Sequence, residues 1–137
     1  MRMNNIDQQE VKKFSDIAEQ WWNKDGDFKP LHVINPLRAN YIKEKVELKD
    51  KKVLDVGCAD WTLMKFLKEN KNVNVRGLEI SKEKVQECIA KGLTVIEGNA
   101  EKDLKQFPDK SFDYVVLSQT LQAFLSPELV LDELLRV

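Results

Sequence analysis

The pattern of apolar and polar positions divides the chain into an N-terminal helical part and a longer part where strands and helices alternate. Over residues 7–22 the apolar side chains recur at the spacing of one face of an amphipathic helix. Residues 28–36 are predicted to be irregular, because Pro30 and Pro36 bound them. A second helix is predicted from about residue 36 to 46, and its inward face is expected to hold Leu37, Tyr41, Ile42 and Val46.

Beyond residue 50, short apolar runs alternate with helical patterns. Ser81 is expected to cap one of the helices, which buries Val85, Cys88 and Ile89 and stops at Gly92. Strands that alternate with helices imply right-handed crossovers and a doubly wound, mostly parallel α/β sheet of about four strands. The predicted strands cover residues 52–57, 73–80, 93–97 and 112–117, and the predicted helices cover 62–70, 81–92 and the stretch from 126 onward.

Length and composition are those of an ordinary globular domain. A chain of 137 residues suits one core, for which we expect a helical cap segment at 1–48 and a ligand-binding domain at 49–137. The formal charge is -1, and lysines are interleaved with acids, which argues against nucleic acid as the main partner. Cys58 and Cys88 form no disulfide framework and suit a cytoplasmic protein. No apolar run reaches about 18 residues, so no membrane span is expected.

The residues that follow the predicted strands are the candidate site, because such sheets bind ligands beyond the carboxyl ends of their strands. Gly57 follows the first strand, where a glycine permits a sharp turn and a close approach of ligand to backbone. Asp55 and Glu79, which end the first and second strands, place two carboxylates beside that turn. The pair suits a nucleoside with a cationic amino-acid tail better than one with pyrophosphate. A tight strand–helix turn without a ligand remains the alternative.

The segment over residues 52–58 resembles motif I of class I S-adenosylmethionine (SAM)-dependent methyltransferases. This resemblance implies a Rossmann-like fold with SAM as cofactor, held at its methionine end by the loop from Asp55 to Gly57 and at its ribose hydroxyls by Glu79. Residues 98–100 would lie near the adenine. Cys58 is interpreted as a packing residue, since no base is evident near it, and no catalytic residue can be named. The expected cofactor-binding residues are Arg38, Asp55, Gly57, Cys58, Ala59, Glu79, Ile80, Asn99, Ala100 and Ser118.

The chain resembles two different subfamilies, one over its N-terminal part and one over the rest. Residues 5–57 are similar to the start of UbiG, the O-methyltransferase family of ubiquinone biosynthesis, through Phe14, Trp21, Trp22 and the stretches 26–32 and 34–38. By this resemblance Arg38 would contact SAM, whereas His32, the only histidine, is expected to have a local structural role in the cap. From about residue 53 onward the chain resembles MetW, a methyltransferase-like family of methionine biosynthesis, through the stretches 77–80, 89–96 and 112–123.

Two departures from the family pattern affect the expected chemistry. The usual Gly-x-Gly-x-Gly loop is replaced by Gly57, Ala59 and Trp61. The Trp61 ring could fill the cofactor space, stack on the ligand or turn away into the core, and we expect a reduced affinity for SAM. The Glu-x-x-Glu-His pattern that resembles a metal site in UbiG-like enzymes is replaced by Gln119, Gln122 and Ala123. Amides hold a hard cation poorly, so no metal is expected.

The sheet of the resembled family has seven strands, whereas this chain ends after the helix that follows its fourth. The edge of that strand would be exposed unless a partner protein, a second copy or the N-terminal helices cover it. The leading interpretation is a SAM-binding domain that methylates a small molecule of ubiquinone-precursor or methionine metabolism. The alternatives are a non-catalytic MetW-like partner protein in methionine biosynthesis, and an inactive chimera or fragment of the fold.

Overall fold

The computed structural model describes residues 9, 25, 29–58, 61–69, 72–118 and 120–137. The chain divides into two compact units, residues 1–37 and 38–137, and each is described by itself. Of the first unit, the described part consists mainly of the start of helix α2 (Lys29–Lys45). The helix predicted over residues 7–22 lies outside the described residues, apart from residue 9, which is helical.

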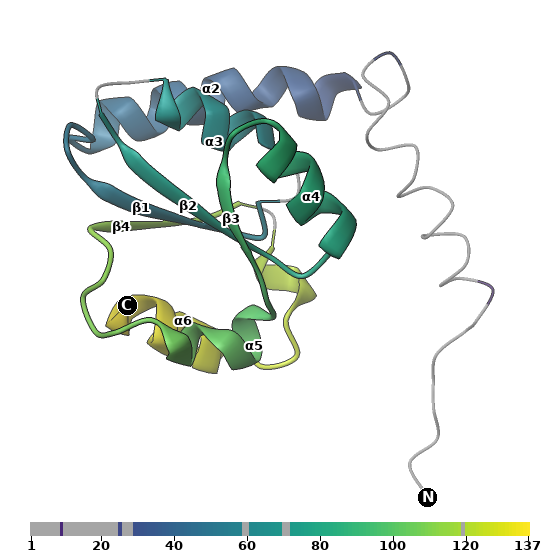
Figure 1. The fold of residues 1–137 in the computed structure, drawn as a ribbon, viewed down its shortest axis with the longest axis vertical. Helices are drawn as coiled ribbons and strands as arrows, with labels where there is room; N and C mark the ends of the chain where they lie inside the picture. The colour runs from purple at the N-terminus through teal and green to yellow at the C-terminus, as the bar shows by residue number, and fades with distance from the viewer. Residues whose placement is uncertain (1–8, 10–24, 26–28, 59–60, 70–71, 119) are drawn as a thin grey trace, which may run out of the picture. The chain divides into compact units, whose positions relative to one another are not determined.

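Four parallel strands form one sheet in the second unit, with the order β3-β2-β1-β4 (Figure 1). In register, Asp55 lies opposite Gly77 on one side and Val116 on the other. The strands are rich in apolar residues, as is usual for a parallel sheet that is covered on both faces. The prediction of a four-stranded parallel α/β sheet is therefore confirmed. The strands are β1 (Lys52–Val56), β2 (Asn74–Glu79), β3 (Thr94–Glu97) and β4 (Tyr114–Leu117).

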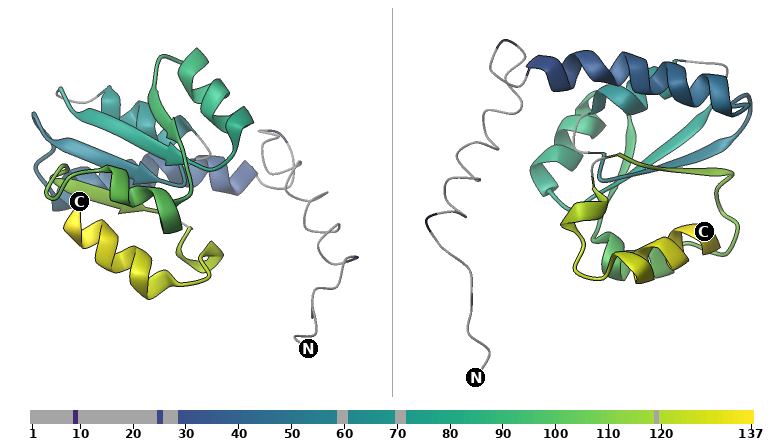
Figure 2. Two further views of the ribbon diagram at one scale, coloured as in Figure 1. Left: turned by 60° about the horizontal axis from the view of Figure 1, so that its bottom comes forward. Right: turned by 180° about the vertical axis from the view of Figure 1, so that it is seen from behind.

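Helices cover the sheet on both faces (Figure 2). One apolar cluster lies between the sheet and the helices α3 (Trp61–Lys68) and α4 (Lys82–Ala90), and Met64, with no exposed surface, is among its members. The other cluster lies on the opposite face, where Leu54, Leu78 and Val130 are buried. The elements on that side are α5 (Ala100–Asp103), the short 3-10 helix η1 (Leu104–Gln106) and α6 (Pro127–Arg136), and a second 3-10 turn, η2 (Leu121–Ala123), precedes α6.

Helix α2 is longer than predicted, since residues 29–36 are helical and the irregular stretch expected there is wrong over these residues. Pro30 falls in the first turn, where the missing N–H has no partner to lose. Pro36 lies inside the helix, where the pattern of prolines alone had indicated a boundary.

The inward face of α2 also differs from the prediction. Ala39 is completely buried, and Ile42 and Val46 pack beside it against the core of the second unit. Leu37 and Tyr41 are 64% and 62% exposed, so their predicted inward orientation is wrong. The positions 39, 42 and 46 form one stripe at helical spacing, and the small Ala39 was not counted as part of it.

Helix α4 begins and ends as predicted. The Ser81 side chain accepts the N–H of Lys84 at 3.5 Å, and Gly92, with φ +76°, follows the last turn. Cys88 is fully buried, but Ile89 is 56% exposed, so its predicted burial is wrong. Ile89 lies about 100° around the helix axis from Cys88, which turns it to the flank of the helix. In the part of the chain that the structure describes, no helix combines the length and apolar character that crossing a membrane requires.

Candidate cofactor site

The parallel strands bring most of the candidate residues to one edge of the sheet. Adjacent parallel strands end at the same edge of the sheet. The strands β2 and β3 are added on one side of β1 and β4 on the other, so the switch point of the strand order lies between β1 and β4. The candidates in or directly after these strand ends are Asp55, Gly57, Cys58, Glu79, Ile80, Asn99, Ala100 and Ser118. Arg38 lies on helix α2 rather than at a strand end, and Ala59 lies outside the described residues.

Gly57 forms the turn after β1 in a conformation that suits only glycine well. Its φ is +70°, in the left-handed region, and its N–H donates to the Leu78 carbonyl at 2.8 Å. A Cβ at this position would lie 2.5 Å from Thr120 Oγ1 and 2.6 Å from its Cγ2. Thr120 in turn donates from Oγ1 to the Ser118 carbonyl at 3.0 Å. The turn is thus fixed by strand β2 on one side and by the loop after β4 on the other.

Two carboxylates lie buried beside this turn. Asp55 is 2% exposed and Glu79 is 6% exposed. Glu79 Oε1 accepts the N–H of Ser81 at 2.9 Å, and the Glu79 backbone carbonyl accepts the N–H of Gly98 at 2.9 Å. Among the described residues, Glu79 Oε2 has no hydrogen-bond partner. One oxygen therefore holds the carboxylate in place, while the other keeps its capacity to accept a hydrogen bond.

The loop after β3 is held by the carboxylate of Asp103, which was not among the predicted site residues. Asp103 Oδ2 accepts the N–H of Asn99 at 2.6 Å, and Asn99 Oδ1 accepts the N–H of Glu101 at 2.9 Å. A Cβ on Gly98 would lie 3.1 Å from Asp103 Oδ2, so the backbone passes close to this side chain. Asp103 thereby orients the segment that carries Asn99 and Ala100.

Cys58 packs beneath the site, and its interpretation as a packing residue is confirmed. The side chain is 2% exposed, and a Cβ on Gly77 would meet Cys58 Sγ at 2.5 Å. Burial, and then the nearby charge of Asp55, raise the pKa of the Cys58 thiol far above its ordinary value. A hydrogen bond joins Cys58 to the buried, free thiol of Cys88, whose pKa burial also raises. Both groups are neutral thiols at physiological pH, which makes them poor nucleophiles.

Trp61 is the first residue of helix α3, and its ring packs against the core. The ring lies against the cluster between the sheet and helices α3 and α4. Lys65 Nζ and Lys91 Nζ approach its centroid to 5.6 Å and 5.1 Å. Of the three orientations left open by the sequence, the structure has the ring turned toward the core, with the ammonium groups of Lys65 and Lys91 near it.

The positions that replace the metal-site pattern of UbiG-like enzymes lie in or before η2. Gln122 and Ala123 are exposed, and Gln119 lies outside the described residues. Within the described ranges, no group of three or more histidine, cysteine, aspartate or glutamate side chains is placed to hold a metal ion.

Comparison with known proteins identifies the family. The family model for "Methionine biosynthesis protein MetW" matches residues 38–137. The chain belongs to the MetW family. A ubiquinone biosynthesis O-methyltransferase of Vibrio atlanticus is 39% identical to this MetW-family chain over 137 residues, covering 95% of the chain and 57% of the relative. The chain spans about half the length of the curated relatives it matches.

Solved structures agree on the fold. A SAM-dependent methyltransferase from Archaeoglobus fulgidus matches with a TM-score of 0.62 and 21% identity, over 80% of the MetW-family chain and 53% of that protein. A Haloferax volcanii methyltransferase in complex with the Trm112 activator matches with a TM-score of 0.68 and 23% identity, over 84% and 53%. The chain therefore has the Rossmann-like fold of class I SAM methyltransferases, as the resemblance implied.

Two residues of the site were not predicted to have a role. Thr120 lies against Gly57, and Asp103 holds Asn99. Thr120 was part of a stretch that resembles MetW, but nothing in its spacing indicates contact with a residue 63 positions earlier. The role of Asp103 could have been predicted from its position four residues after Asn99, because an aspartate near a helix start commonly accepts a backbone N–H.

Proposed function

We propose that this chain is the SAM-binding part of a methyltransferase that transfers a methyl group to a small-molecule acceptor. The observation that carries the proposal is the left-handed turn at Gly57 beside the buried carboxylates of Asp55 and Glu79. A turn without side chain admits a ligand close to the backbone, and buried carboxylates favour a cationic ligand. SAM carries both a sulfonium and an ammonium group, so its charge complements these acids.

Each part of SAM would have a group of the described residues to bind it. Glu79, whose Oε2 keeps its accepting capacity, would accept hydrogen bonds from the ribose hydroxyls. Asp55 and the Gly57 turn would face the methionine portion, and Asn99 with Ala100 would lie beside the adenine. Bound SAM would supply an electrophilic methyl group, and the chain would contribute mainly its positioning. The remaining proposed contacts are Arg38, Cys58, Ala59, Ile80 and Ser118.

The acceptor would be a small molecule of methionine or ubiquinone-precursor metabolism. The matched family favours the methionine context, whereas the relative from Vibrio atlanticus favours the ubiquinone context. Two free, buried cysteines suit a reducing compartment, and we place the protein in the cytoplasm.

Isothermal titration with SAM and S-adenosylhomocysteine tests the proposal. We expect saturable binding by the unaltered chain, and binding about 10- to 100-fold weaker for Glu79→Gln, because a hydrogen bond to a charged group is worth about 1.5–3 kcal/mol. Glu69→Gln is the matched control, since Glu69 is an exposed residue directly after α3 whose side chain pairs with Lys65. Absence of heat at millimolar ligand, with the fold verified by circular dichroism, would refute cofactor binding.

A second function is favoured by the family match, namely a non-catalytic partner protein in methionine biosynthesis. Strand β4 pairs with β1 on one side only among the described residues, and each of its four residues is partly exposed. On helix α6, Leu131 is 40% exposed and Leu135 is 87% exposed. An open strand edge and exposed leucines are both surfaces that proteins usually cover.

In this function, a protein partner or a second copy of the chain would bind at this edge. The Haloferax volcanii methyltransferase, which was solved with an activator protein bound, is a precedent for partnership among proteins of this fold. Co-purification with a homoserine acyltransferase, lost in Leu131→Asp and Leu135→Asp variants, would support the partner function. A monomer that turns over SAM with a supplied acceptor would instead support the enzymatic one.

A further inference from the structure

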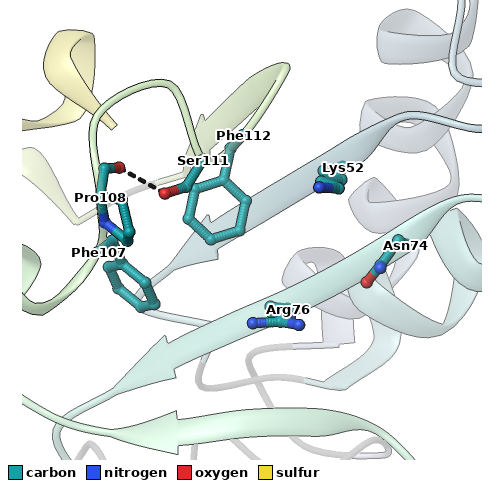
Figure 3. A pocket seen from close by; sticks show the side chains of 7 residues that line it. All are labelled: Lys52, Asn74, Arg76, Phe107, Pro108, Ser111 and Phe112. Carbon is teal, nitrogen blue, oxygen red and sulfur yellow. Dashed lines mark hydrogen bonds between the residues drawn. The ribbon is translucent and has the colours of Figure 1, made fainter.

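A second candidate site lies on the opposite end of the sheet from the cofactor edge. A cavity of about 210 Å³ opens at the amino-terminal halves of β1 and β2 and is closed on one side by residues 107–112. Figure 3 shows Lys52, Asn74 and Arg76 side by side on these strands, with the rings of Phe107 and Phe112 beside them. Its lining combines positive charge with aromatic surface.

The two cations that line this cavity, Lys52 and Arg76, lie on adjacent strands. Lys52 and Asn74 are register partners on β1 and β2, and Arg76 follows two residues later, so Lys52 and Arg76 are diagonal neighbours on one face. Among the described residues, neither side chain forms an ion pair or a hydrogen bond. The nearby carboxylate of Asp113 is engaged by the backbone N–H of Lys52 at 2.8 Å.

In the part of the chain that the structure describes, Arg136, an arginine in the same region, is paired with acidic side chains, unlike Arg76. Arg136 is paired with Asp109 at 2.7 Å and with Glu133 at 3.0 Å. Its guanidinium also donates to the carbonyls of Phe107 at 2.9 Å and Leu104 at 3.0 Å. Arg136 therefore fixes the segment that carries the Phe107 ring, whereas the guanidinium of Arg76 keeps its planar set of donors available for an anion.

The aromatic wall adds a preference for a flat apolar group. The rings of Phe107 and Phe112 meet edge to face, with centroids 5.3 Å apart and an interplanar angle of 78°. Pockets for drug-sized ligands occupy roughly 300–1,000 Å³, so a cavity of about 210 Å³ suits a molecule with a single ring. We propose that this cavity binds a small aromatic carboxylate, with its carboxylate at Arg76 and Lys52 and its ring against Phe107 and Phe112.

Chemical shifts in a ¹⁵N-labelled sample test this site with three probes. Benzoate carries both the charge and the ring, benzamide has the ring without the charge, and inorganic phosphate has the charge without the ring. We expect benzoate to shift the amides of Asn74, Arg76 and Phe112 saturably, and to bind more tightly than either of the other probes. Binding of phosphate as tight as that of benzoate would overturn the assigned ligand class.

Variants separate a built site from general attraction to positive charge. Arg76→Gln and, independently, Lys52→Gln should each weaken benzoate binding by about tenfold, the size of one charge-assisted hydrogen bond. Lys82→Gln, an exposed lysine at the start of α4, is the matched control and should leave it unchanged. Shifts that do not saturate, or an affinity for benzoate that is unchanged in both cavity variants, would overturn the proposal. Binding of S-adenosylhomocysteine by Arg76→Gln reports separately on the cofactor edge.

Discussion

Replacement of Gly57 by alanine should destabilise the fold through two separable effects. The left-handed conformation at φ +70° costs a residue with a side chain about 1–2 kcal/mol. The added methyl group would also lie 2.5 Å from Thr120 Oγ1 and 2.6 Å from its Cγ2, and overpacking of this kind costs about 1–3 kcal/mol. We therefore expect Gly57→Ala to lower the free energy of unfolding by about 2–5 kcal/mol.

Gly92 provides a control in which only the first effect operates. Its φ is +76°, but a Cβ there would have no neighbour within 4 Å. Gly92→Ala should thus cost about 1–2 kcal/mol, and the excess for Gly57→Ala measures the contact with Thr120. Urea unfolding followed by circular dichroism gives both values, and unchanged slopes would show that the unfolded states are comparable.

A double-mutant cycle isolates the contact itself. Thr120→Ala removes Oγ1 and Cγ2 and leaves a Cβ at 3.1 Å from the position of the new methyl group. In that background the cost of Gly57→Ala should fall to about 1–2 kcal/mol, which is a coupling of about 1–3 kcal/mol. Additive effects of the two substitutions, or equal costs at Gly57 and Gly92, would refute the packing of Thr120 against the turn.

The remaining predictions concern the thiols and a helix cap. Cys58 and Cys88 should resist Ellman's reagent at pH 8 in the folded chain and react fully in urea, because burial raises the pKa of both thiols; rapid reaction of the folded chain would contradict their burial. Since the folded pKa values exceed the ordinary value of 9.0, the stability that these thiols contribute is complete below pH 9 and should decrease above it, as urea midpoints measured from pH 8 to 10 would show. Ser81→Ala should cost about 0.5–1 kcal/mol through loss of its bond to the Lys84 N–H, whereas Ser126→Ala, where the structure has no side-chain cap bond, should cost less; equal urea midpoints for the two variants would argue against the cap.

Much of the fold was predictable because its signals are local. The apolar runs at β1 and β4 and the cap at Ser81 each follow from a few adjacent residues. Burial on a helix was less predictable, since it depends on what the helix packs against. Ile89 has the right periodicity but lies on the flank of α4, and Ala39 is too small to stand out although it is completely buried.

Some residues of the candidate site could also be predicted from the sequence, whereas others could not. Gly57 and Glu79 could be singled out because parallel strands place their carboxyl ends together. Thr120 could not, because its contact with Gly57 depends on how the loop after β4 folds back over β1. The orientation of the Trp61 ring depends on Lys91, which helix α4 brings close from 30 positions further along the chain.

Amide chemical shifts measured with S-adenosylhomocysteine test the location of the cofactor most directly. We expect saturable shifts at Gly57, Glu79 and Gly98, which lie at the carboxyl ends of three neighbouring strands. The amides of Lys52 and Arg76, at the other end of β1 and β2, should stay unchanged. Shifts confined to Lys52 and Arg76, or no shifts at millimolar ligand, would contradict a cofactor site at the carboxyl ends of the strands.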